Sequence, residues 1–381
     1  MSGVVNRTGR VPSLPATLPL LSKFSKIAAR VLPGLSKAAL YFAAFLVLVN
    51  MNSFPFTWHY KIFRHIWIIR IKFLLYKLRL LGKSRETKKR LETAWLDRLT
   101  PMGSDPWGCG TVIKKFAGPD ESDYNLHLSN SSYPKVIDEA RMITAIVSFP
   151  SFYRVGGWTA LGGTHFTFYR EIPLFSSYEI RTNIACWDGK WLYIIHRFVS
   201  PQKKRKGRAR NEDSESQPRN PPSNSAPAPI LHTPAVGTIT PSSSQSMISP
   251  ATMKIITDAR LRAEEPDGAT LNCVAVSEVC FKLGRITVPP SIALAMNGIS
   301  RPSPGTPYSH ENPPPHWNKV TELTNDPKAI RAFLSGGWRE VPPAECWWEH
   351  ALAGPIEETR KSNLELVDGL RRSMEGAKAL Y

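Results

Sequence analysis

The chain has 381 residues, 42% of them hydrophobic, which is enough to bury the core of one domain with appendages or of two small domains. Its formal net charge is +18, but no acidic residue precedes Glu86, so the positive excess is concentrated in the N-terminal segment. This asymmetry favours a membrane surface as the partner and disfavours a nucleic-acid-binding fold.

The five cysteines lie far apart in the sequence, and none of them has CxxC spacing. An odd number without paired spacing argues against a disulfide framework and a zinc site, and it favours a reducing compartment. We therefore expect no metal, and each cysteine is more simply explained as a small buried residue. Motifs of serine hydrolases, NTPases and dinucleotide-binding proteins do not stand out, so those chemistries lack support.

The N-terminal third suggests attachment to a membrane. Residues 1–31 are polar and basic, and we expect them to be flexible. Residues 32–56 contain an apolar run from Ala38 to Met51, interrupted by Asn50, and about 20 apolar residues are needed to cross a bilayer. This pattern predicts a transmembrane anchor and a single-pass protein of the endoplasmic reticulum rather than the mitochondrion. A mitochondrial presequence remains an alternative, because the first 37 residues contain Ser and Arg and no acid.

Residues 57–100 combine aromatic and basic side chains, followed by a charged stretch. This composition predicts a basic amphipathic helix in the lipid headgroup region and a stem, so that membrane lipid becomes a partner. The alternative is a helix that packs on its own domain.

Next comes a short polar loop, followed by a segment in which apolar residues recur with the spacing of a helix. The loop runs from Asp123 to Tyr133, and the run from Val136 to Val147 has the apolar spacing of one buried helix face. Pro134 suits a first helical turn, and Asn130, Ser131 and Ser132 are candidate caps. A carboxylate held near free helix amides is suited to a thioester, because the amides can hold the carbonyl oxygen.

Alternating segments predict strands on either side of a long insertion. The expected strands are Thr111–Phe116, Thr164–Ile172, Tyr178–Trp187, Trp191–Val199 and Ala269–Leu283, with turns at Gly156-Gly157, Gly162-Gly163 and Asp188-Gly189. Residues 201–252 include the basic stretch 203–210 and are rich in Ser and Pro, which predicts disorder. The order of strand, helix and consecutive strands is typical of an α+β fold.

Beyond this domain, residues 301–316 form a Pro-rich linker, and residues 317–381 are predicted to be a helical C-terminal extension. The tryptophans of the extension indicate that it packs either on the domain or on a second subunit.

The pattern Asp-x-x-x-His-x-x-Asn-x-x-Tyr, at Asp123, His127, Asn130 and Tyr133, resembles the hotdog-fold acyl thioesterases, in particular their membrane-anchored thioesterase-like branch. A second block, Phe166–Phe175 followed by Tyr178–Thr182, supports the resemblance. It implies a hotdog domain over residues 105–290, in which an antiparallel sheet wraps around one central helix. It also implies a homodimer or higher homo-oligomer with an acyl channel at the subunit interface.

The resemblance implies catalytic roles for three of these residues. Asp123 matches the carboxylate that acts as general base or nucleophile, His127 would polarise the carbonyl or orient Asp123, and the backbone amide near Asn130 would bind the oxyanion. The Asn130 side chain would cap the helix. The simpler interpretation is that Asp123 and His127 only order the loop, and Asp120 is the nearest alternative carboxylate. Asp138 and Glu139, one helical turn on, are expected to be solvated or structural.

The resulting hypothesis is a membrane-associated thioesterase that hydrolyses an acyl-CoA or acyl-carrier-protein thioester without a cofactor. The alternative is a catalytically inactive hotdog protein that binds acyl chains or serves as a membrane scaffold.

Overall fold

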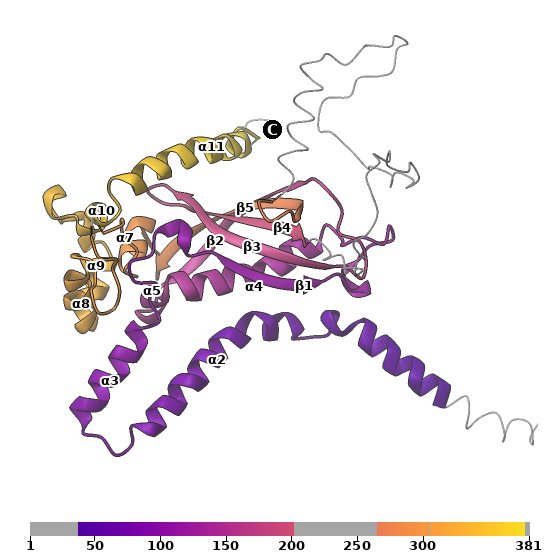
Figure 1. Ribbon diagram of the computed structural model, residues 1–381, viewed down its shortest axis with the longest axis horizontal. Coiled ribbons are helices and arrows are strands. Elements are labelled where there is room, and N and C mark those ends of the chain that lie inside the picture. Colours follow the sequence, from indigo (N-terminus) through magenta and orange to yellow (C-terminus); the bar gives the residue numbers. More distant parts are fainter. Residues whose placement is uncertain (1–36, 202–264, 304, 378–381) are drawn as a thin grey trace, which may run out of the picture.

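The computed structural model describes residues 37–201, 265–303 and 305–377 (Figure 1). The N-terminal residues 1–31 and residues 202–252 of the insertion, for which flexibility and disorder were expected, lie outside the described residues. The elements are η1 (Met51–Ser53), α2 (Thr57–Arg79), α3 (Arg85–Asp97), η2 (Pro106–Gly108), β1 (Thr111–Phe116), η3 (Pro119–Glu121), α4 (Ser132–Ser148), α5 (Pro150–Arg154), β2 (Trp158–Phe168), β3 (Ser177–Trp187), β4 (Leu192–Ser200), β5 (Thr270–Leu283), β6 (Ile286–Val288), α7 (Pro290–Ala295), α8 (Trp317–Asn325), α9 (Pro327–Leu334), η4 (Gly337–Arg339), η5 (Pro343–Glu345), α10 (Trp347–Ala351) and α11 (Pro355–Ala377).

The centre of the molecule is an antiparallel sheet with one long helix against it. The strand order is β1-β3-β4-β5-β2, every neighbouring pair is antiparallel, and the short β6 pairs with β5. Helix α4 lies along one face of the sheet (Figure 1). This is the α+β hotdog arrangement expected from the order of predicted elements.

Helix α4 buries its predicted apolar face. Val136, Ile137 and Ala140 are buried and contact sheet residues such as Ile180 and Phe198 in one hydrophobic cluster. Burial of a side chain of this size stabilises the fold by about 1.5–3 kcal/mol. The predicted face extends one residue too far, because Val147 is exposed.

One predicted turn is instead a bulge within a strand. Gly162 and Gly163 lie inside β2, where the pairing register with β5 shifts between Leu161 and Gly163. A Cβ on Gly162 would come within 2.5 Å of the Trp191 ring, so glycine is required by close packing rather than by a chain reversal.

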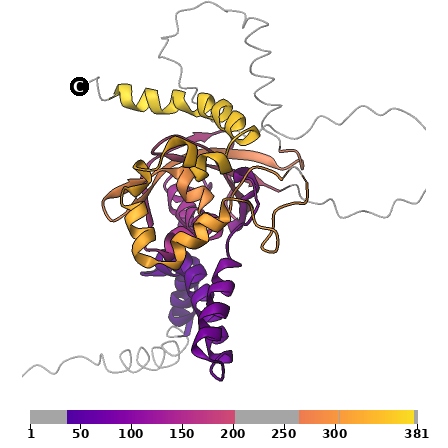
Figure 2. The same cartoon turned by 90° about the vertical axis from the view of Figure 1, so that its left-hand side faces the viewer.

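The C-terminal extension packs on the domain itself. Helices α7 to α10 gather at one end of the sheet, where Leu334, Trp348 and Ile356 join the same hydrophobic cluster as Phe281 of β5 (Figure 2). Helix α11 lies across the sheet face opposite α4, and Arg360 donates a hydrogen bond to the Trp187 carbonyl at 2.7 Å. The tail was expected to pack either on the domain or on a second subunit, and the structure shows that it packs on the domain.

The transmembrane anchor and the single-pass localisation were wrong. Within the described parts of the chain, no helix combines the length and the apolarity required to cross a bilayer. Residues 37–49 are helical, and a turn at Asn50 and the 3-10 helix η1 end that helix before the end of the predicted anchor. The Asn50 side chain donates to the Leu46 carbonyl at 2.9 Å, which places a polar group at this break.

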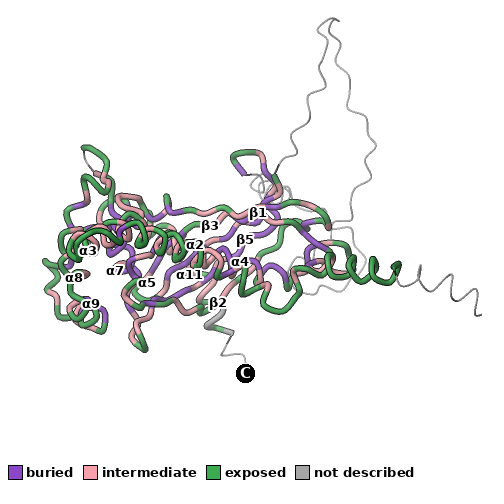
Figure 3. The backbone as a smooth tube through the Cα atoms, turned by 90° about the horizontal axis from the view of Figure 1, so that it is seen from below, coloured by how far each residue is buried: buried purple, intermediate pink, exposed green. Residues whose placement is uncertain are grey.

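Helix α2 lies beside α4, on the side of α4 away from the sheet (Figures 1 and 3). The Arg64 guanidinium lies 2.6 Å from the buried Glu139 carboxylate of α4, and Lys115 of β1 also bonds to that carboxylate. The Trp58 indole donates to Asp138 at 3.1 Å. Glu139 was expected to be either solvated or structural. It is structural, because its side chain is buried. Packing of α2 on its own domain is the alternative that the structure favours.

Candidate functional site

The loop before α4 folds back on itself and is held in a defined shape. Ser122 and Leu128 form an antiparallel bridge, and the Asp123 amide donates to the His127 carbonyl at 2.9 Å. Leu126 has φ +62°, a left-handed conformation that is uncommon for a non-glycine residue. Such strain persists where the surroundings enforce it and is often found at functional sites.

The Asp123 carboxylate is oriented by the loop that carries it. Its Oδ1 atom accepts hydrogen bonds from the amides of Asn125 at 2.9 Å and of His127 at 3.5 Å. The side chain is neither buried nor fully exposed, so a substrate can reach it. The structure thus brings Asp123 and His127 together through the backbone of the loop.

The His127 imidazole pairs with Glu171 rather than with Asp123. Its Nε2 atom lies 3.0 Å from a Glu171 carboxylate oxygen. This contact is made because the Asp123 loop runs beside the segment after β2, with the Leu128 amide donating to Ile172 and the Leu174 amide to Leu126, both at 2.8 Å. No role for Glu171 was predicted from the sequence, although this residue lies in the second block of the resemblance.

Helix α4 begins at Ser132 and its N-cap is Ser131, so the Asn130 side chain is not the cap. The Ser131 side chain makes no cap hydrogen bond to the helix and instead pairs with Ser129 at 2.9 Å. First-turn amides lack partners within a helix, and the helix dipole adds partial positive charge there. Asn130 is exposed directly before this helix end.

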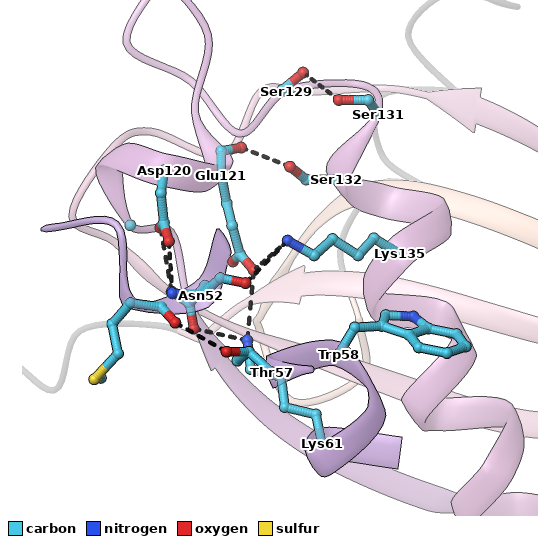
Figure 4. Close-up of polar contacts among 12 residues, drawn as sticks. Asn52, Thr57, Trp58, Lys61, Asp120, Glu121, Ser129, Ser131, Ser132 and Lys135 are labelled. Atoms are coloured by element: carbon cyan, nitrogen blue, oxygen red, sulfur yellow. Dashed lines mark hydrogen bonds and ion pairs between the residues drawn. The ribbon is translucent and has the colours of Figure 1, made fainter. Parts of the chain in front are cut away.

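Glu121 fixes both ends of the Asp123 loop. Its carbonyl accepts from the Ser129 amide at 2.9 Å and from the Ser132 hydroxyl at 2.7 Å (Figure 4). Its buried carboxylate lies 3.6 Å from the Lys61 ammonium of α2 and 4.0 Å from that of Lys135 of α4. Burial lowers the pKa of Lys61, and Glu121 opposes that shift.

The neighbouring Asp120 ties the same loop to the segment before α2. Its two carboxylate oxygens accept from the amide and the side chain of Asn52 at 2.7 and 3.2 Å. Lys61 in turn donates to the Asn52 side chain at 2.7 Å (Figure 4). The loop that carries Asp123 is therefore anchored by residues outside the sheet and outside α4.

Tyr133, the last residue of the loop motif, is a packing residue. It is buried between Phe168 and Phe198, and burial raises the pKa of its hydroxyl, with Glu171 and Asp123 contributing through their negative charge. The tyrosine therefore stays protonated at neutral pH.

The comparisons with known proteins point to one family. Residues 117–214 match the family model described as Thioesterase-like superfamily. The chain is 26% identical over 192 residues to the Probable thioesterase atnL of Emericella nidulans, covering 43% of this chain and 54% of that protein. It is 32% identical over 84 residues to Protein THEM6 of Xenopus laevis, covering 22% of this chain and 41% of that protein.

Among solved structures, the YbaW Probable Thioesterase from Escherichia coli is similar with a TM-score of 0.29 and 11% identity, covering 49% of this chain and 94% of that one. The chain spans about half the length of the curated relatives it matches.

Proposed function

Residues 117–214 belong to the thioesterase-like superfamily, and on that premise we propose that this protein hydrolyses an acyl thioester carried on coenzyme A or an acyl carrier protein. The observation that supports the proposal is the Asp123 carboxylate, which accepts from two amides of its own loop in the segment that leads into α4. The relatives named as thioesterases support the reaction class.

In the proposed reaction, a first-turn amide of α4 other than that of Ser132, which donates to the Ser129 carbonyl, holds the thioester carbonyl oxygen as negative charge develops on it. One such donor contributes about 3–4 kcal/mol to transition-state stabilisation. Asp123 either attacks the carbonyl carbon, giving an anhydride that water then hydrolyses, or removes a proton from the attacking water. In both routes the C–S bond breaks, a C–O bond forms, and a carboxylic acid and a free thiol leave.

His127 and Glu171 complete the proposed site as a pair. The carboxylate fixes the orientation of the imidazole, and the imidazole lies on the same loop as Asp123. In this position and with both ring nitrogens protonated, His127 can donate from Nδ1 a hydrogen bond to the substrate or a proton to the departing thiolate. Positioned acid/base groups of this kind typically contribute about 10²–10⁴-fold in rate.

The proposed functional unit is a homodimer formed through strand β2. This strand is at the end of the sheet order, so its outer edge has no strand partner among the described residues. Leu161 of β2 and Val147 of α4 are exposed apolar residues. An exposed apolar strand edge is a template for pairing with another copy of the chain.

An acyl-chain binder without turnover is the second candidate. The observation that favours it is that Asp123 Oδ1 already accepts two loop amides, as a purely structural aspartate would. The two candidates share a ligand and differ only in whether a thiol is released.

Thiol release from a panel of acyl-CoAs, from acetyl to palmitoyl and including benzoyl, tests the proposal on the full chain. Hydrolysis of any member above the rate of a heat-denatured sample supports an enzyme, and the preferred member defines the substrate class. Saturable binding of acyl-CoA with no thiol released would replace the enzyme with the binder.

A further inference from the structure

A pocket of about 370 Å³ lies between α2, α4, α5, β2, β4 and β5. Its volume is within the range of about 300–1,000 Å³ that is usual for small-molecule sites. Most of its lining is apolar or aromatic, with Met142 and Ala145 of α4, Trp158 of β2 and Phe281 of β5 as examples. Its surface is therefore suited to an uncharged apolar group.

One wall of this pocket comes from outside the residues that match the family. Trp58, Ile62 and Phe63 belong to α2, which precedes the matched residues 117–214. This wall is fixed in place, because the Trp58 indole bonds to Asp138 and Lys61 contacts Glu121 in the same stretch of helix (Figure 4). One turn further on, Arg64 bonds to Glu139.

The charged groups of the pocket already satisfy one another. Arg141 bonds to Asp138 and also donates to the hydroxyls of Thr164 at 3.1 Å and Ser277 at 3.0 Å. The Tyr153 hydroxyl bonds to Thr159 at 3.0 Å. With its guanidinium paired in this way, Arg141 does not offer a free cation, so a neutral acyl group fits this pocket better than an anion.

The pocket has a direction along α4. Its charged pair, Asp138 and Arg141, lies at the middle of α4, about 9–14 Å along the helix from Ser132. From Asp138 to Phe149 the lining follows α4 for about 16 Å, at 1.5 Å per residue. A group that reached the pocket from the Asp123 end of α4 would therefore meet the charged pair first and the apolar lining beyond it.

We propose that this pocket binds the apolar acyl group of the substrate, and that Trp58 and Phe63 of α2 determine which acyl groups fit. The inference rests on the proposed thioesterase function. It assigns to α2 a direct part in substrate selection, in addition to its packing on the domain.

The test measures binding to the full chain of two thioether analogues that cannot be hydrolysed, S-decyl-coenzyme A and S-methyl-coenzyme A. The pocket predicts that the decyl analogue binds more tightly, because only its chain reaches the apolar lining. Phe63→Ala removes one wall and should weaken S-decyl-coenzyme A by about tenfold, with little effect on S-methyl-coenzyme A. Ala145→Phe fills the pocket and should have the same selective effect.

Tyr60→Ala is the matched control, because Tyr60 is an exposed aromatic residue of the same helix that does not line the pocket. Unchanged affinity for S-decyl-coenzyme A in both pocket variants, or equal loss in the control, would overturn the inference. If the protein hydrolyses acyl-CoA but the pocket variants bind S-decyl-coenzyme A as tightly as the parent, the proposed thioesterase function is retained and the proposed acyl-binding pocket is rejected. If the pocket variants weaken only S-decyl-coenzyme A and no acyl-CoA is hydrolysed, the acyl-binding pocket is retained and the thioesterase function is rejected.

Discussion

The His127 imidazole and the Glu171 carboxylate, 3.0 Å apart, form the contact that orients one side of the candidate site. A carboxylate partner fixes both the ring orientation and the nitrogen that carries the proton. The other ring nitrogen is then available to substrate. This arrangement makes Glu171 a positioning residue in the proposed mechanism.

Glu171→Gln keeps the size of the side chain and removes its charge. We expect kcat for acyl-CoA hydrolysis to fall by about tenfold with little change in KM, which is less than the 10²–10⁴-fold typical of an acid/base group. Glu179→Gln is the control, because Glu179 pairs with Arg181 within β3. Equal kcat in Glu171→Gln and the parent protein would remove Glu171 from the account.

The loop spacing of Asp123 and His127 identified the candidate site from sequence, but the partner of His127 could not be found that way. The contact depends on the chain reversing at Leu126 and lying beside the segment after β2. That reversal is a tertiary feature with no local signal, since leucine rarely adopts positive φ. In the sequence, Glu171 stood out only as a member of the block Phe166–Phe175, which resembles the thioesterase family.

At the scale of elements, α2 is the part of the molecule that holds the Asp123 loop from outside. Lys61 contacts Glu121, which lies directly before the loop, and Asn52, which bonds to the neighbouring Asp120. A shift of about 1 Å in a reacting group can reduce a rate by about 10²-fold. The docking of α2 is therefore expected to affect catalysis without touching substrate chemistry.

Lys61→Met retains most of the side-chain volume and removes the ammonium group. We expect kcat to fall by on the order of tenfold while the circular dichroism spectrum is unchanged, because only the loop loses a partner. Lys77→Met, in the last turn of the same helix and paired with Glu92, should have no effect on kcat. A Lys61→Met variant with full activity would show that the loop holds its shape without α2.

The buried Glu139 contacts α2 and β1 at the same time and gives the fold a pH dependence. Burial raises its pKa, but Lys115, Arg64 and His65 together outweigh burial, so the pKa lies below its ordinary value. A carboxyl whose pKa is lowered on folding stabilises the protein above its unfolded-state pKa, and this stabilisation is lost as the pH falls through the folded-state value.

Glu139→Gln is expected to lower the free energy of unfolding by about 1–3 kcal/mol at pH 7, because the half-buried Lys115 and the partly exposed Arg64 lose their charged partner. Urea unfolding at several pH values should show this difference shrinking as the pH falls below the ordinary glutamate pKa of 4.5. Glu322→Gln, in an exposed pair with Lys319, should change stability by no more than about 1 kcal/mol. A difference that stays constant with pH would contradict the linkage.

The strands and α4 were predictable because their apolar periodicities differ clearly, with period two in β3 and β4 and helical spacing in α4. The docking of α2 was not predictable. Its basic residues pair with Glu121 and Glu139, which lie far along the chain and look solvent-facing by pattern alone. The same basic and aromatic composition also fits a membrane surface, which is why the sequence pattern predicted a helix in the lipid headgroup region.

At the scale of the whole molecule, the chain forms three layers around the sheet, with α11 on one face, α4 on the other and α2 beyond α4 (Figure 1). These layers cover both faces of the sheet but leave the edge of β2 without a strand partner among the described residues. The proposed dimer would extend the sheet across this edge.

Leu161→Lys places a charge on the β2 edge, where Leu161 is 51% exposed. Charged edge residues prevent strand pairing, so sedimentation should show a shift from dimer to monomer. Leu366→Lys on α11, at a residue 79% exposed, is the matched control and should leave the dimer intact. A parent protein that sediments as a monomer would reject the proposed assembly.

The most direct test of the central claim compares Asp123→Asn with Asp120→Asn in acyl-CoA hydrolysis by the full chain. The two carboxylates lie three residues apart, but Asp123 accepts from two amides of its own loop, while Asp120 accepts from the amide and side chain of Asn52. We expect Asp123→Asn to lower kcat by about 10²–10⁴-fold, whereas Asp120→Asn, which only weakens the anchoring of the loop, should lower kcat by no more than about tenfold. Full activity in Asp123→Asn, or an equal loss in both variants, would contradict the central claim.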